Sequence, residues 1–225
     1  MKLENIDKSI QKQDILQGIS LEVSPQKLTA FIGPNGAGKS TLMKILTGIY
    51  RKDAGEIRYL GREVEYRGPA ESEEDGIVIV HQELNMMNDL TVAQNLFIGK
   101  EIMKGALIDD QSMKRKAAEL FSLLNISIDP AEKIGNLTVG KQQMVEIAKA
   151  LSVRARILIM DEPTSALSGR EIEELFRIIR RLKEQGHGIV YISHRLDELS
   201  HIADRVSIMR DGRMVSSGSF SANRC

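Results

Sequence analysis

The sequence predicts an α/β protein in which helices cover a mostly parallel β-sheet. Strand-like and helix-like segments alternate along the chain, which is the pattern of parallel strands joined by helical crossovers. Four short apolar runs each lead directly into polar residues, as expected where ligands bind at the carboxyl ends of parallel strands. These four runs are residues 28–32, 77–80, 157–160 and 189–192.

The first run leads into a complete phosphate-binding loop of the pattern G-x-x-x-x-G-K-[ST]. Its glycines let backbone N–H groups turn toward phosphate oxygens, Lys39 supplies a positive charge, and the Ser40 hydroxyl can reach a magnesium ion. An apolar stripe then marks a helix whose positive N-terminus would face the anion. The alternative is an ordinary glycine-rich turn. The predicted phosphate-binding residues are Gly33, Pro34, Asn35, Gly36, Ala37, Gly38, Lys39, Ser40 and Thr41.

Two segments near the start of the chain indicate an added antiparallel patch. Residues 15–23 and 56–64 are rich in alternating and β-branched residues, and Gly55 and Gly61 interrupt the pattern. Near the other end, Asp211-Gly212 is typical of a hairpin turn between residues 206–210 and 213–215. Residues 216–225 show no periodicity, and we expect a loose tail there.

Between about residues 83 and 156 the pattern becomes helical, which predicts a helical insertion into the α/β core. Apolar residues recur at helical spacing, namely Met113, Ala117, Leu120, Phe121 and Leu124. A further helix is predicted over 168–185, where Ser168 and Glu171 form a capping box and Gly186 ends the helix. We therefore expect a single domain with a core of residues 1–82 and 157–215.

The composition excludes several classes of protein. Lysine plus arginine and aspartate plus glutamate both number 31, so no net charge favours nucleic acid. The single cysteine, Cys225, rules out a disulfide within the chain. No apolar run approaches the roughly eighteen residues of a membrane span, and the first residues lack an apolar signal segment. We expect a cytoplasmic protein without a nucleic acid partner.

Polar residues at the strand ends are the candidate catalytic groups. Asp161 and Glu162 follow the third apolar run, where one acid can hold magnesium together with Ser40 and the other can polarise an attacking water. His194 follows the fourth run and could contact a γ-phosphate and hold water and acid in line. Gln82 follows the second run, and its amide oxygen could complete the magnesium shell. The alternatives are two solvated acids and a plain loop glutamine. The other histidines lack metal-type spacing with His194, which argues against zinc.

A second anion site is predicted where a helix begins without a phosphate loop of its own. The residues before and at the start of this helix are Leu137, Thr138, Val139, Gly140 and Lys141. Met144, Ile147 and Ala148 give the helix an apolar face, so its positive end would carry free backbone amides. This arrangement suggests a dimer in which the helix end of one subunit closes over nucleotide held by the other. A plain capped helix is the alternative.

Taken in order, GPNGAGKST, Gln82, LTVGKQQ, ILIMDEP, SALS and His194 resemble the ATP-binding subunit of an ABC transporter, from Met1 to about Val215. HQELNMMNDLTVAQNLFIGKE and LTVGKQQMVEIAKAL resemble the sugar-importer branch that handles ribose, galactosides and xylose. The resemblance implies a P-loop NTPase core and a cassette dimer that sandwiches two ATP molecules with Mg²⁺. It further implies membrane permease subunits, an indirect sugar-binding protein, and a peripheral location on the inner face of the cell membrane.

The resemblance also implies roles for individual residues. Residues 33–41 would be the Walker A loop, Gln82 the Q-loop, residues 137–141 the signature, and His194 the switch histidine. Asp161 and Glu162 would end the Walker B strand. The D-loop would comprise Ser165, Ala166, Leu167 and Ser168. Adenine would contact Ile10, and a coupling helix of the membrane subunit could contact Met86, Met87 and Leu90, which could equally pack within the helical insertion.

Several positions depart from the common family pattern. Val139 and Lys141 stand where glycine and glutamine are usual, Ser168 replaces an aspartate, and Ile10 replaces an aromatic ring. The chain also holds one cassette where this branch usually carries two. Two rival functions therefore remain: a non-transport ABC ATPase working on ribosomes or DNA, and a cassette that binds nucleotide without turnover unless a second cassette joins it.

Overall fold

The computed structural model describes residues 1–81 and 86–220 and confirms the predicted α/β class. By its internal contacts the chain divides into two compact units. The first unit comprises Met1–Ile79, Ala155–Glu162 and Leu182–Cys225, and the second comprises Val80–Arg154 and Pro163–Arg181. Among the described residues, none of the helices is both long enough and apolar enough to cross a membrane.

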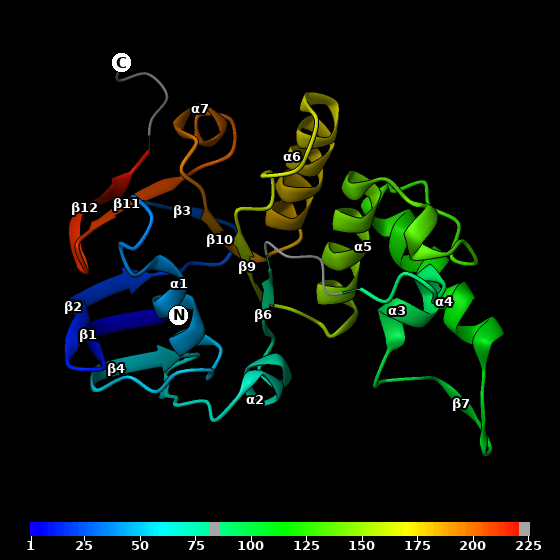
Figure 1. The fold of residues 1–225 in the computed structure, drawn as a ribbon, viewed down its shortest axis with the longest axis horizontal. Helices are drawn as coiled ribbons and strands as arrows, with labels where there is room; N and C mark the ends of the chain where they lie inside the picture. The colour runs from blue at the N-terminus through cyan, green and yellow to red at the C-terminus, as the bar shows by residue number, and fades with distance from the viewer. Residues whose placement is uncertain (82–85, 221–225) are drawn as a thin grey trace. The chain divides into compact units, whose positions relative to one another are not determined.

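A six-stranded sheet is the centre of the first unit (Figure 1). In spatial order its strands are β12 (Arg213–Ser219), β11 (Arg205–Arg210), β3 (Leu28–Ile32), β10 (Gly188–Ile192), β9 (Ile157–Asp161) and β6 (Ile77–Val80). Strand β10 pairs in parallel with β3 and β9, and β11 pairs in parallel with β3. The side chains of β10 are buried without exception, as expected for a central parallel strand. The predicted parallel sheet is therefore confirmed.

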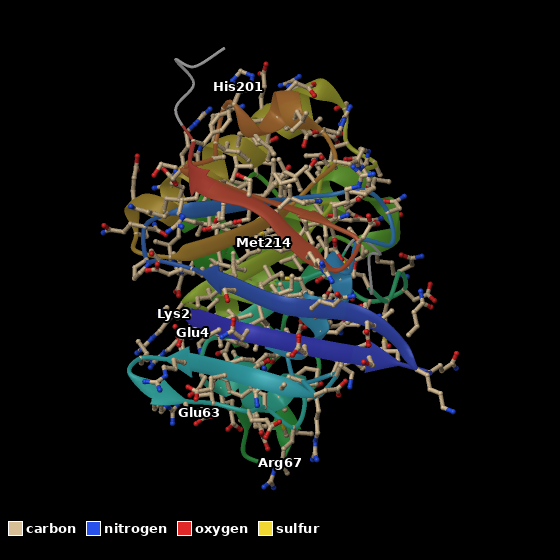
Figure 2. The ribbon with its side chains drawn as sticks, turned by 90° about the vertical axis from the view of Figure 1, so that its left-hand side faces the viewer. Lys2, Glu4, Glu63, Arg67, His201 and Met214 are labelled. Carbon is tan, nitrogen blue, oxygen red and sulfur yellow. The ribbon has the colours of Figure 1, made fainter. Side chains whose placement is uncertain are left out.

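The predicted antiparallel patch is a four-stranded sheet of order β2-β1-β4-β5. Its strands are β1 (Lys2–Ile10), β2 (Gln13–Glu22), β4 (Ala54–Tyr59) and β5 (Arg62–Glu63). Strand β1 was not predicted, although it pairs with both β2 and β4. Lys2 and Glu4 lie on its exposed face (Figure 2), whereas Leu3 and Ile6 are buried. This alternation is typical of a sheet with one solvated face.

Helix α1 (Lys39–Leu46) buries its apolar stripe in the core of the first unit. That core contains residues of both sheets, including Ile19 of β2 and Ile159 of β9, together with Leu42 and Met43 of α1. The helix that follows the phosphate loop is thus held by buried contacts with both sheets. Two short helices, α2 (Pro69–Glu74) and α7 (Leu196–Leu199), also belong to this unit.

The second unit is mainly helical (Figure 1). Besides residues 80–154 it includes residues 163–181, which the sequence indicated as part of the core. Its elements are α3 (Val92–Phe97), the hairpin strands β7 (Met103–Lys104) and β8 (Leu107–Ile108), α4 (Asp110–Leu124), a 3₁₀ turn (Ile134–Asn136), α5 (Val139–Ser152) and residues 169–181 of α6 (Gly169–Glu184). In α4 the predicted stripe is buried at Met113, Ala117, Phe121 and Leu124. Thr91 and Gln94 form a reciprocal capping box at the start of α3.

The C-terminal part of the chain differs from the sequence prediction. Strand β12 continues through Ser219 and pairs with β11 along that length, so the expectation of a loose tail was wrong for residues 216–219. Ser207 and Ser217 of the two strands also share a hydrogen bond of 3.0 Å between their hydroxyls. Backbone pairing with β11 stabilises this exposed strand. Because its side chains are mostly polar, the sequence shows no pattern that predicts a strand. Residues 221–225 of the predicted tail lie outside the described residues.

Candidate functional site

The predicted phosphate loop connects β3 to α1, as the sequence indicated. Two of its glycines are required by close contacts. A Cβ atom on Gly33 would lie 2.2 Å from the backbone carbonyl oxygen of Met209. A Cβ on Gly38, whose φ is +98°, would lie 2.7 Å from Leu16 and 2.9 Å from the carbonyl oxygen of Ile15. The loop is therefore packed against β2 and β11, and only glycine allows this approach.

The Lys39 side chain turns back into the phosphate loop. It is 6% exposed, and its Nζ donates to the carbonyl oxygens of Gly33 at 2.7 Å and Pro34 at 3.0 Å. Burial lowers the pKa of Lys39, while the negative charges of Glu162 and Asp161 act in the opposite direction. The loop thus holds a partly desolvated cation next to two carboxylates, in a position suited to an anionic ligand.

Ser40 and Asp161 come together at the end of β9. The distance from Ser40 Oγ to Asp161 Oδ2 is 3.5 Å, the outer limit of a hydrogen bond. A hydroxyl and a carboxylate are the oxygen ligands that Mg²⁺ takes beside phosphate oxygens, so this pair fits the predicted metal. Across residues 1–81 and 86–220 no group of three or more His, Cys, Asp and Glu side chains forms a metal-binding cluster. A magnesium ion here would therefore depend on phosphate oxygens and water for its remaining ligands.

Glu162 and His194 form the second pair in the first unit. Glu162 Oε1 lies 3.2 Å from His194 Nδ1, and the Glu162 side chain is 18% exposed while that of His194 is 59% exposed. The backbone of Glu162 has a φ of +46°, in the left-handed region, and its N–H donates to the carbonyl oxygen of Ile192 at 3.0 Å. Such a conformation costs about 1–3 kcal/mol and tends to occur where function needs it. Glu162 therefore combines a strained backbone with a side-chain contact to His194.

The predicted signature residues begin α5 in the second unit. Thr138 is the N-cap, and its Oγ1 accepts from the Lys141 N–H at 3.3 Å. Val139 is 45% exposed, whereas Gly140 is buried. Leu137 directly precedes the cap. The side-chain cap at Thr138 is therefore present, and it does not exclude an additional role of this helix end in anion binding.

A carboxylate that the sequence did not single out for this site lies at the start of α5. Glu171 Oε1 accepts from Thr138 Oγ1 at 3.3 Å, and a Cβ on Gly140 would lie only 2.0 Å from the same oxygen. The other oxygen of Glu171 accepts from the N–H and the hydroxyl of Ser168, at 2.9 and 2.7 Å. These hydrogen bonds lower the pKa of Glu171, and the two from Ser168 have the largest effect. The predicted capping pair at the start of α6 thus also contacts the signature.

The second unit also contains the predicted D-loop, residues 165–168, and a cavity. The cavity has a volume of about 470 Å³, and its wall includes Thr138, Gly140, Lys141, Ser168 and Glu171. The signature and the last D-loop residue therefore line one hollow within this unit. The wall also includes the apolar side chains of Ile126, Ile128 and Met144 and a second carboxylate, Glu174, so the hollow has a mixed lining.

The remaining predicted residues have the following positions. Ile10 ends β1 and pairs with Gln13, and it is 36% exposed. Gln82 lies outside the described residues, so its assignment to the metal stays a prediction. Met87 is 56% exposed, while Met86 and Leu90 are half-buried.

The first unit thus combines an α/β core with a phosphate loop, the Ser40–Asp161 pair and the Glu162–His194 pair. The family described as ABC transporter matches residues 16–165, and the chain belongs to this family. Its fold is shared with a nucleotide-free ATP-binding cassette from an ABC transporter, at a TM-score of 0.88 and 29% identity over 98% of this chain and 91% of that one. For the ADP conformation of MJ1267, another such cassette, the TM-score is 0.87 and the identity is 30%, over 97% of this chain and 90% of that one.

Relatives with assigned roles point to one branch of the family. The chain is 51% identical over 215 residues to the ribose import ATP-binding protein RbsA of Geobacillus kaustophilus. It is 53% identical over 216 residues to a putative ribose/galactose/methyl galactoside import ATP-binding protein of Burkholderia cenocepacia. Each match covers 95% of this chain but only 44% and 42% of the relative. The chain therefore spans less than half the length of these relatives.

Proposed function

We propose that this chain is an ATP-binding and ATP-hydrolysing cassette of an ABC importer for a small sugar. The observation that carries this proposal is the convergence, in one compact unit, of the phosphate loop, the Ser40–Asp161 pair and the Glu162–His194 pair. The sugar class is supported by relatives about 50% identical whose names specify ribose or galactose import.

The phosphate loop would bind the triphosphate through its backbone amides and Lys39. The ammonium now donates to the carbonyl oxygens of Gly33 and Pro34, and phosphate oxygens are stronger acceptors because they carry charge. Exchanging these partners would leave the lysine in the same loop and place its charge against the phosphates. Ser40 and Asp161 would hold Mg²⁺, which stabilises the negative charge that develops on the transferred phosphoryl group.

Glu162 would orient the attacking water, and His194 would hold Glu162 in place. The carboxylate accepts a hydrogen bond from the imidazole if the proton is on Nδ1, which leaves its other oxygen available for water. In the same tautomer His194 keeps Nε2 as an acceptor. The pair can therefore fix the direction of water attack, and such positioning acts together with electrostatic stabilisation of the phosphates in phosphoryl transfer.

A second cassette and membrane permease subunits would assemble with this cassette into the transporter, with the cassettes at the inner face of the membrane. The signature at the start of α5 would close over ATP bound to the other cassette, through Thr138 and Gly140. A related cassette, MJ0796, is described as dimeric, with 25% identity and a TM-score of 0.79 over 97% of both chains. Sugar would reach the permease from a separate binding protein.

The decisive experiment is Glu162→Gln, which keeps the shape of the side chain but removes its charge. We expect the variant to bind ATP as the unchanged chain does and to lose at least about a hundredfold in steady-state hydrolysis. Glu63→Gln is the matched control, because Glu63 is an exposed residue of β5 (Figure 2). Unchanged hydrolysis in Glu162→Gln would reject the assigned role of this carboxylate.

A further inference from the structure

The switch histidine sits on a short segment between β10 and α7. Ser193 precedes it and is 2% exposed, whereas the His194 side chain is 59% exposed. Arg195 follows, and α7 has only four residues. A helix of this length has no stability of its own, so the direction of His194 must be set by contacts of the neighbouring side chains.

Glu198 of α7 supplies these contacts. It is 6% exposed, and its carboxylate faces residues on both sides of His194. Oε2 accepts from the Tyr191 hydroxyl at 3.1 Å and from the Ser193 hydroxyl at 3.4 Å. Oε1 accepts from Arg195 Nη1 at 2.8 Å.

The segment is closed by one more hydrogen bond. The Arg195 N–H donates to Ser193 Oγ at 3.0 Å, so the two residues that flank His194 are bonded to each other and to Glu198. A buried carboxylate is costly unless it is paired and hydrogen-bonded. These hydrogen bonds tie the backbone on both sides of the histidine to one buried group.

We propose that Glu198 is a positioning residue that holds His194 at hydrogen-bond distance from Glu162. This inference rests on the proposed function only in giving the Glu162–His194 pair a role in hydrolysis. Glu198 acts on the histidine through its hydrogen bonds with Ser193 and Arg195, the two residues that flank His194. Loss of its charge would release the segment and lengthen the Glu162–His194 contact.

The test uses Glu198→Gln in the full chain, with Asp197→Asn as the control that removes a neighbouring exposed charge from the same helix. Nitrogen-15 NMR of the histidine side chains, assigned with His194→Ala, reports the hydrogen bond at His194 Nδ1 without added nucleotide. We expect Glu198→Gln to shift or broaden the His194 signals and leave His187 unchanged. Its kcat for ATP should fall roughly tenfold while the KM stays within twofold. Asp197→Asn should leave both the His194 signals and the kcat unchanged.

The outcomes separate the two proposals. His194 signals that are unchanged in folded Glu198→Gln would overturn the positioning role. Should that variant not fold, Ser193→Ala removes a donor to Glu198 and the acceptor of the Arg195 N–H and leaves the Arg195–Glu198 ion pair. Shifted His194 signals would then support the proposal, and unchanged ones would overturn it. Absence of ATP turnover in the unmodified chain would count against the proposed function alone, because the NMR result does not depend on turnover.

Discussion

At the scale of single residues, the phosphate loop contains two glycines that are needed for different reasons. The Gly33 position is blocked by a backbone carbonyl, that of Met209, which has no freedom to rotate away. Gly36 has a φ of +79° but no atom within 4 Å of an added Cβ. An alanine at Gly33 therefore tests the steric contact, and an alanine at Gly36 tests the backbone conformation.

We expect Gly33→Ala to destabilise the fold about three times as much as Gly36→Ala. Forcing a methyl group into a packed site costs up to about 3 kcal/mol, whereas a left-handed alanine costs about 1 kcal/mol. Urea unfolding of the three chains, followed by far-UV circular dichroism, measures the difference. Equal losses, or a larger loss for Gly36→Ala, would show that the contact with Met209 does not constrain the loop.

Lys39 gives a prediction in which ATP binding weakens without a loss of stability. Its pKa is lowered by burial, so the folded chain holds the charged form at some cost. Lys39→Met keeps the apolar stem and removes the charge. We expect ATP to bind at least about tenfold more weakly, while the free energy of unfolding stays equal or rises. Calorimetric titration with ATP and urea unfolding provide the two measurements, and unweakened ATP binding would contradict the assignment.

At the scale of elements, the starts of α5 and α6 share one carboxylate. Glu171 accepts from Ser168 at the start of α6 and from Thr138 at the start of α5. We expect Glu171→Ala to lower the free energy of unfolding by about 1 kcal/mol at pH 7, a loss of the size measured for helix caps. Glu173→Ala is the control on the next exposed position of α6.

The pH dependence of that difference has a definite sign. Hydrogen bonds hold the pKa of Glu171 below its value in the unfolded chain. Its contribution is therefore fully present above the unfolded pKa of about 4.5 and is lost as the pH falls through the folded pKa. Unfolding at pH 7, 5 and 4 should show the gap between unmodified chain and variant narrowing only at the lowest pH. A gap that widens on acidification would exclude the proposed hydrogen bonds.

Elements differed in how much the sequence could reveal. Strands β3, β9 and β10 are buried apolar runs, so composition alone marked them and the polar residues at their ends. Strand β1 alternates and carries a left-handed Asn5, and β12 is polar and exposed; both are held by backbone pairing that only the partner strand defines. Met209 packs against Gly33, which is distant along the chain, and Glu198 is a buried carboxylate bonded to the residues around His194. No local sequence pattern indicates either role.

At the scale of the whole molecule, the site in the first unit needs a second cassette under the proposed function. The chain spans less than half the length of its relatives, and a second copy of this chain is one source of that cassette which dilution can test. If copies pair, specific ATPase activity should rise with chain concentration below the dimer dissociation constant and then level off. Specific activity that is constant over a hundredfold dilution would argue against a dissociable dimer of copies.

Mixing two inactive variants tests the head-to-tail arrangement directly. Lys39→Met disables the phosphate loop but leaves the signature intact. Val139→Glu adds a negative charge at the signature, where Val139 is 45% exposed. An acidic residue in the first turn favours the helix, so the fold should persist while the phosphate bound to the opposite copy is repelled.

In a mixed pair, the phosphate loop of the Val139→Glu chain meets the signature of the Lys39→Met chain, so one of the two nucleotide sites is intact. We expect the mixture to recover ATPase activity that neither variant has alone, with Val139→Gln remaining active as the uncharged control. Without recovery in a mixture that still forms dimers, the phosphate loop and the signature would not act across two copies of this chain.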